Sequence, residues 1–277
     1  MVMSKILSFS NQKGGVGKTT TCVNMSAYLA LFGKKVLLID LDPQGNASSG
    51  LGVQKNALKH STYSLLCDPD FSAADAIIDT VIPGLSIIPS NIDLAGAEIE
   101  LVNMENNTRM LTSAIDKIKD DYDYITIDCP PSLGLLTINA LAASSGVIIP
   151  IQCEFYALEG LTQLINTIKL VIKHLKPTLE IEGVVMTMYD SRALVSVQIA
   201  AEIKKYFGKK LFTHAIPRNI RVSEAPSHGV PVMLHDNNCA GTRAYRRLTK
   251  EFLNREEERL KQAQAEQPSA KSAADAE

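Results

Sequence analysis

The feature that most constrains the fold of this chain is a glycine-bearing loop between an apolar run and a helical pattern. Residues 13–20 read KGGVGKTT and follow the apolar run at 6–9. Glycines have no Cβ, so backbone N–H groups can curl closely around an anion, and the N-terminus of the next helix adds unpaired donors. A strand, a glycine-rich turn and a helix are the context that a phosphate-binding loop requires. The sequence therefore predicts that the chain binds a phosphate-bearing ligand here.

Two side chains of this loop have separate expected roles. Lys18 brings a full positive charge to the β- and γ-phosphates, and the Thr19 hydroxyl is a ligand for Mg²⁺. The common pattern G-x-x-x-x-G-K-[ST] would place its first glycine at position 12, where this chain has Gln12. Lys13 adds a second lysine to the loop instead. We expect the phosphates to be held by Lys13, Gly14, Gly15, Val16, Gly17, Lys18, Thr19 and Thr20.

Carboxylates follow two further apolar runs. The run at 36–39 leads into Asp40 and Asp42, and the run at 124–127 ends in Asp128, before two prolines. Carboxylates at the carboxyl ends of parallel strands lie beside a bound nucleotide. Asp128 is therefore expected near the water shell of a bound metal ion. An isolated D-x-D segment, such as the one that contains Asp40 and Asp42, is more often a solvated turn. The prediction that these two aspartates lie at the nucleotide site therefore depends on their distance in sequence from the glycine loop.

The rest of the chain predicts the architecture around this site. Apolar runs of strand length occur at 85–88, 146–151, 181–188 and 211–216, with helical patterns between them. Near-continuous aliphatic strands that alternate with helices predict an α/β fold, with a doubly wound, mostly parallel sheet and helices on both faces. We expect one domain over residues 1–254. Residues 255–277 lack aromatic and β-branched residues, so this tail is expected to be frayed or disordered.

Charge and cysteine content narrow the functional classes. The net charge of −2 and a pI near 6.2 exclude a uniformly basic nucleic-acid binder, although residues 192–250 alone carry +8 and the remainder −10. Such a local basic region is either a solvated surface or a phosphate-backbone binding face.

Five scattered cysteines without a C-x-x-C pair indicate reduced thiols in a cytoplasm. No apolar stretch reaches the ~18 residues of a membrane span.

The sequence KGGVGKT, with its additional lysine, resembles the deviant Walker A motif of the ParA/MinD group of P-loop ATPases. The resemblance covers about residues 4–254 and implies an ATP hydrolase that uses ATP/ADP and Mg²⁺. It implies that Asp40 lies in the metal shell and that Asp42 orients the attacking water. The metal set is then Thr19, Asp40 and Asp128, and the catalytic set is Lys13, Lys18 and Asp42. In this family Lys13 reaches the partner's phosphates, which implies a homodimer that sandwiches ATP.

Two later segments, at 188–192 and 216–229, resemble those of chromosomal, Soj-type ParA proteins of chromosome or plasmid partitioning. The resemblance implies that Arg192, Arg221 and, more weakly, Arg218 bind double-stranded DNA without sequence preference. Pro217, Arg218 and Asn219 are also expected to border the adenine. A ParB-type centromere-binding partner would stimulate hydrolysis and release the DNA. The expected location is the cytoplasm, in association with the nucleoid.

Three alternatives are weaker. A MinD-like, membrane-cycling ATPase would have a similar site, but it ends in a basic amphipathic helix, whereas this chain has mixed charge and no large apolar residue after Leu260. No membrane partner is therefore expected. Iron–sulfur relatives need paired cysteine ligands, although Cys129 by itself does not exclude a bridged cluster. A purely architectural DNA-binding protein would not need the phosphate loop.

Overall fold

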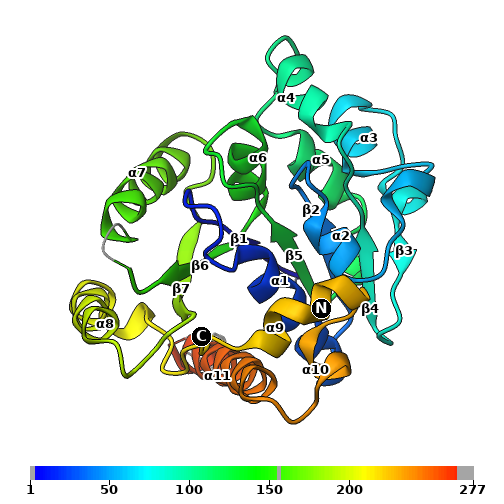
Figure 1. Cartoon of the computed structure of the whole chain (residues 1–277). Helices are drawn as coiled ribbons and strands as arrows, with labels where there is room; N and C mark the ends of the chain where they lie inside the picture. Colours follow the sequence, from blue (N-terminus) through cyan, green and yellow to red (C-terminus); the bar gives the residue numbers. More distant parts are fainter. Residues whose placement is uncertain (1–3, 155–156, 267–277) are drawn as a thin grey trace, which may run out of the picture.

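The structure is a computed structural model that describes residues 4–154 and 157–266. Within these residues one sheet contains seven strands in the order β3-β4-β2-β5-β1-β6-β7 (Figure 1). All neighbouring strands are parallel except β3 and β4, which are antiparallel. The strands are β1 (Lys5–Phe9), β2 (Val36–Asp40), β3 (Ile78–Asp79), β4 (Leu85–Ile88), β5 (Tyr124–Asp128), β6 (Gly146–Gln152) and β7 (Glu180–Thr187).

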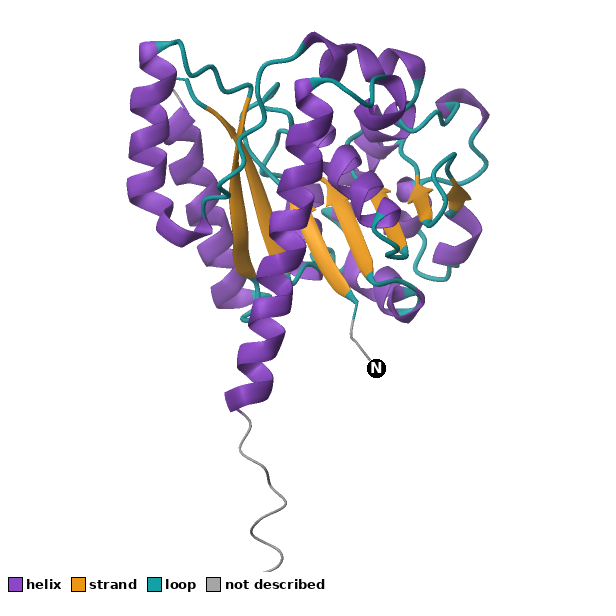
Figure 2. Cartoon of the chain, turned by 90° about the horizontal axis from the view of Figure 1, so that it is seen from below, coloured by secondary structure: helices purple, strands orange, loops and turns teal. Residues whose placement is uncertain are grey.

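Helices cover both faces of this sheet (Figure 2), which confirms the predicted fold class. Every residue of β2, β5 and β6 is buried, because a parallel strand covered on both faces has no solvated side. The helices are α1 (Lys18–Leu31), α2 (Asn46–Gly50), α3 (Thr62–Cys67), α4 (Leu94–Leu101), α5 (Met110–Asp116), α6 (Leu135–Ala143), α7 (Ala157–His174), α8 (Leu194–Phe207), α9 (Ile220–Glu224), α10 (Val232–His235) and α11 (Ala240–Glu266).

One face of the sheet is covered by α1 and α11, which also contact each other. The buried side chains of Tyr245, Leu248 and Phe252 bring α11 into the same apolar core as α1 and β1. Two hydroxyls are satisfied within this contact: Tyr28 donates to the carbonyl of Thr242 at 3.1 Å, and Tyr245 lies 3.4 Å from the Thr21 hydroxyl. α1, which follows the glycine loop, is therefore fixed from both sides.

The strand predicted at 211–216 is not formed. This segment meets β7 at only two backbone positions, where Phe212 N donates to Val184 O and Ile216 N donates to Met186 O. Between them, the backbone N–H groups of Thr213 and His214 donate to the carboxylate of Glu251 on α11. A side chain thus takes the His214 N–H, which is the donor that a continuous parallel ladder would direct at β7. In addition, β3 was not predicted, because its two residues are exposed and form no apolar run.

Helix α11 continues to Glu266, so residues 255–266 of the predicted tail are helical (Figure 2). The expected fraying does not begin at 255, because Arg255 donates to the Glu251 carboxylate and to Leu211 O. One turn further, Arg259 pairs with Glu182 of β7. Residues 267–277 of the predicted tail lie outside the described residues.

Candidate nucleotide-binding site

The glycine loop leaves β1 and enters α1 with the backbone shape that an anion cradle needs. Gly15 and Gly17 have φ of +72° and +82°, in the left-handed region that favours glycine, and Gly17 precedes the first turn of α1. A Cβ built on Gly14 or Gly15 would meet no other atom within 4 Å, so the mouth of the loop is open. The loop is held from behind, because the Thr187 hydroxyl at the end of β7 donates to Val16 O at 2.7 Å.

Lys18 is buried at the base of this loop. Its Nζ donates to Lys13 O at 3.2 Å, which closes the loop on itself. Burial lowers the pKa of Lys18, while the charge of Asp128 acts in the opposite direction. A cation held here without a direct carboxylate partner retains hydrogen-bonding capacity for phosphate oxygens.

Asp40 and Asp128 lie side by side, because they are paired in register on β2 and β5. Both are fully buried. Asp40 accepts hydrogen bonds from Ser48 N at 2.8 Å and Ser48 Oγ at 2.7 Å, and burial raises its pKa to about 6. Burial, followed by the charge of Asp40, also raises the pKa of Asp128 well above its usual range. Two adjacent buried carboxylates favour a cation between them and the phosphates.

The residues present fit a magnesium ion. Neither carboxylate oxygen of Asp128 accepts a hydrogen bond of good geometry from the described residues, although Thr19 is near enough to moderate its pKa. Among these residues, no group of three or more His, Cys, Asp or Glu side chains is placed to hold a metal ion. Mg²⁺ is commonly bound through one or two protein oxygens together with waters and substrate phosphates. Thr19, with Asp40 and Asp128 behind it, offers a set of this kind.

A cavity of about 730 Å³ opens above the loop. Its volume is that of an ordinary small-molecule or cofactor site. Of the predicted residues, its lining contains Gly14, Gly15, Gly17, Lys18, Thr19, Thr20, Asp42, Pro217, Arg218 and Asn219. The glycine loop and the 217–219 segment, which are about 200 residues apart in sequence, therefore lie on the walls of one cavity. The carboxylate of Asp42 accepts the N–H of Gln44 at 2.9 Å, which orients it at the cavity wall.

Four of the residues predicted for the nucleotide-binding site are not in this lining. Val16, Asp40 and Asp128 are buried beneath the cavity floor. Lys13 instead pairs through its Nζ with the Glu154 carboxylate at 2.7 Å, and both side chains are partly exposed.

A large part of the opposite wall was not predicted from the sequence. It is built by the end of β7 and by the turns after Asn219, and it contains Thr187, Met188, Val222, Ser223, Ala225, Pro226, Ser227, Val230, Pro231 and Val232. Thr187 had a signal, since it lies near the end of the strand predicted over 181–188, and ligands bind at the ends of strands in such sheets. The turns after Asn219 carry no nucleotide-binding motif. They reach the cavity only because the chain folds back on itself.

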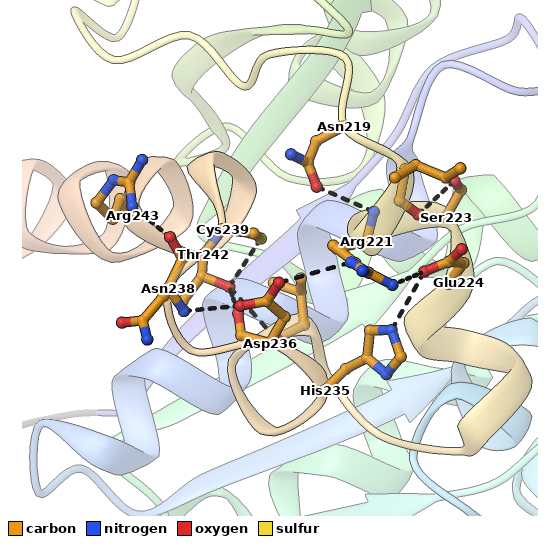
Figure 3. A network of polar contacts seen from close by, with 12 residues as sticks. Asn219, Arg221, Ser223, Glu224, His235, Asp236, Asn238, Cys239, Thr242 and Arg243 are labelled. Carbon is orange, nitrogen blue, oxygen red and sulfur yellow. Dashed lines mark hydrogen bonds and ion pairs between the residues drawn. The ribbon is translucent and has the colours of Figure 1, made fainter.

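The three arginines predicted to bind DNA are not gathered into one cluster with free side chains. Arg192 is 89% exposed by side chain and pairs with Asp190 at 3.0 Å. Arg218 lines the cavity. Arg221, on α9, pairs with Glu224 at 2.9 Å and with Asp236 at 3.6 Å (Figure 3). DNA contact by these residues stays a prediction.

A mostly parallel α/β sheet, with a glycine loop and a following lysine and threonine at the end of its central β1, defines a P-loop nucleotide-binding protein. Comparison with known proteins agrees: residues 4–181 match the AAA domain family.

The relatives define the family more closely. The chain is 55% identical to the sporulation initiation inhibitor protein Soj of Bacillus subtilis over 249 residues, which cover 90% of this chain and 98% of that protein. It is 49% identical over 261 residues to the chromosome partitioning protein ParA of Caulobacter vibrioides, with 94% and 97% covered. The chain belongs to the Soj/ParA family of chromosome partitioning proteins.

A solved structure shares the fold. Cobyrinic acid a,c-diamide synthase from Mycobacterium smegmatis, with bound ADP and magnesium, superposes with a TM-score of 0.78 at 36% identity and covers 90% of this chain and 93% of that one. Among the residues that the structure describes, none of the helices combines the length and the apolar character needed to cross a membrane.

Proposed function

We propose that this chain is a partitioning ATPase that hydrolyses ATP to ADP and phosphate. The observation that carries the proposal is the convergence of Lys18, Thr19 and Asp42 on one cavity, above the buried pair Asp40 and Asp128. The similar mycobacterial structure, with its ADP and magnesium, supports ATP or ADP and Mg²⁺ as the ligands of this cavity.

Each residue has a chemical role in this proposal. The loop N–H groups and the Lys18 ammonium bind the β- and γ-phosphates and stabilise the charge that develops on them. Asp42, oriented by Gln44, accepts a hydrogen bond from the attacking water and aims it. Thr19, Asp40 and Asp128 would hold Mg²⁺. When bound, Mg²⁺ neutralises charge on the phosphate oxygens.

The second part of the proposal is an ATP-sandwich homodimer. Lys13 lies outside the lining of its own cavity and is 34% exposed by side chain, so it is available to a neighbouring subunit. To reach a partner's phosphates it must leave Glu154. That exchange of one anionic partner for another is easy at an exposed position, where an ion pair is worth only about 0–1 kcal/mol.

The third part concerns DNA. Arg192 and Arg221 are exposed within the basic 192–250 region, which fits backbone binding without sequence preference. We propose that the ATP-bound dimer binds DNA, that the protein is cytoplasmic and associated with the nucleoid, and that a ParB-type partner stimulates hydrolysis and so releases the DNA. The partitioning names of the relatives support this role.

DNA binding without nucleotide, with ADP and with ATP, on two unrelated duplexes, tests the proposal. We expect tight binding to both sequences with ATP alone, and its loss in Arg221→Glu. Absence of binding under every condition, despite ATP hydrolysis, would remove the DNA role. Pelleting with anionic vesicles would then test the membrane-cycling alternative.

Light scattering tests the sandwich. Wild type should shift from monomer to dimer with ATP, and Lys13→Ala should not, because it removes the charge that crosses to the partner. Asp42→Ala should form the dimer and retain it, because it slows hydrolysis. Wild-type behaviour of both variants would contradict the mechanism.

A further inference from the structure

Arg221 is enclosed by carboxylates that lie on different elements (Figure 3). Its Nη1 donates to Glu224 Oε2 at 2.9 Å, one turn along the same segment. Its Nε lies 3.6 Å from Asp236 Oδ2, in the turn between α10 and α11. The guanidinium therefore has an anionic partner on two of its edges.

Both carboxylates are themselves held in place. Asp236 Oδ1 accepts the N–H of Asn238 at 2.9 Å, and the Asp236 carbonyl accepts the Thr242 hydroxyl at 2.6 Å. Glu224 Oε2 lies 3.5 Å from His235 Nε2, and hydrogen bonds from Arg221 and then His235 lower the pKa of Glu224. Asp236 is thus anchored near the start of α11 and Glu224 lies beside His235 of α10, and the arginine is drawn toward both.

This arrangement opposes phosphate binding. One arginine and two carboxylates carry a formal charge of −1, so a DNA backbone that approaches Arg221 meets no net attraction from this group. A phosphate must also compete with these carboxylates for the guanidinium, since its Nη1 and Nε already face Glu224 and Asp236.

The segment that carries Arg221 also borders the nucleotide cavity. Asn219, Val222 and Ser223 are in the cavity lining, whereas Arg221 and Glu224 are not. Asn219 begins α9, because its side-chain oxygen accepts the N–H of Arg221 at 3.0 Å. A ligand that displaces the Asn219 side chain therefore acts directly on the backbone that positions Arg221.

We propose that Glu224 and Asp236 are positioning residues that restrain Arg221, and that nucleotide in the cavity releases this restraint through α9. The inference rests on the proposed function, in which Arg221 contacts DNA. It makes the acidic pair a brake on DNA binding by the nucleotide-free protein.

The test measures binding of a fluorescent duplex of arbitrary sequence by Glu224→Gln, Asp236→Asn and the double variant, without nucleotide and with ATP, across a salt series. Two partly exposed ion pairs that each compete weakly with a phosphate predict a gain of about threefold to tenfold without nucleotide for the double variant. The gain should be smaller with ATP. The slope of log affinity against log salt should steepen by about one, because one more phosphate contact forms.

Two controls separate restraint from simple removal of negative charge. Glu202→Gln removes an exposed acid on α8, away from this network. The double variant is also measured in an Arg221→Ala background, where the gain should vanish because the restrained group is absent.

The outcomes decide the two proposals separately. The restraint is overturned if the double variant shows no gain, if Glu202→Gln gains as much, or if the gain persists without Arg221. If wild type fails to bind DNA with ATP, the proposed function fails. A nucleotide-free double variant that then binds through Arg221 would still support the restraint.

Discussion

The residues whose burial costs this chain the most free energy are the carboxylates of its nucleotide-binding site. Asp40 and Asp128 are fully buried on neighbouring strands, and no described lysine or arginine forms an ion pair with either. Serine and backbone donors satisfy Asp40, whereas Asp128 has no hydrogen bond of good geometry. Burial raises the pKa of both carboxyls, and the charge of Asp40 adds to the rise for Asp128, which means that folding disfavours their charged forms. Such a pair stabilises the protein that has bound a cation and destabilises the protein that has not.

We therefore predict opposite effects of Asp128→Asn on stability and activity. Without metal or nucleotide, the free energy of unfolding should rise by about 1 kcal/mol, because a buried charge is removed. Magnesium-dependent ATP turnover should fall by about 10–100-fold. Chemical denaturation in EDTA and an ATPase assay measure the two effects, with the exposed Asp70→Asn as the control that changes neither. A variant less stable than wild type in EDTA would contradict this account.

At the scale of elements, α11 is fixed by two kinds of contact. Its first half packs apolar side chains on the core. Its second half is tied by charge, because Glu182 of β7, which is 2% exposed by side chain, pairs with Arg259 at 2.8 Å and with Lys5 of β1 at 2.7 Å. Burial alone would raise the pKa of Glu182, but hydrogen bonds from Arg259 and Lys5 outweigh it and lower the pKa. The helix thus continues beyond its apolar contacts.

Arg259→Ala should loosen this second half while it leaves the cavity intact. The buried carboxylate keeps only Lys5, so we expect a loss of about 1–3 kcal/mol in the free energy of unfolding. Hydrogen exchange should become faster over residues 256–266. Lys261→Ala, on the same stretch of helix but outside the network, is the matched control. Equal exchange in both variants would show that the ion pair does not hold the helix.

At the scale of the whole molecule, the cavity joins parts of the chain that are distant in sequence. The glycine loop and Asp42 form one wall, and residues 216–232 form the other. Both walls rest on the same core, because α1 and α11 pack together in it and Ile216, Ala225 and Val232 belong to it. A ligand that fills the cavity bridges these parts and must stabilise the entire fold.

Mg-ATP at about 100 times its dissociation constant should therefore add about 2.7 kcal/mol of stability and raise the midpoint of thermal unfolding by roughly 5–10 °C. Differential scanning fluorimetry measures the shift, and addition of EDTA should reduce it. In Lys18→Ala the shift should be absent, because the buried ammonium at the base of the loop is gone. A full shift in that variant would place the nucleotide elsewhere.

Predictions from the sequence are most accurate where the structure depends on residues that are neighbours along the chain. The glycine loop, its Lys18 and the aspartates at 40, 42 and 128 follow apolar runs directly, and the sheet places each of them at or beneath the cavity. The fold class also follows from local patterns, since buried aliphatic runs alternating with helices admit few arrangements.

The sequence by itself thus determined the class of fold, the phosphate loop and the family, because short-range backbone geometry and residue order encode them. Tertiary structure alone decided the rest. Residues 211–216 resemble a strand, but Glu251 takes the His214 N–H that a strand would direct at β7. The turns after Asn219 became a cavity wall, and Arg221 acquired Asp236 as a partner, through folding. Competition for hydrogen bonds and charges between distant segments is settled only when those segments meet.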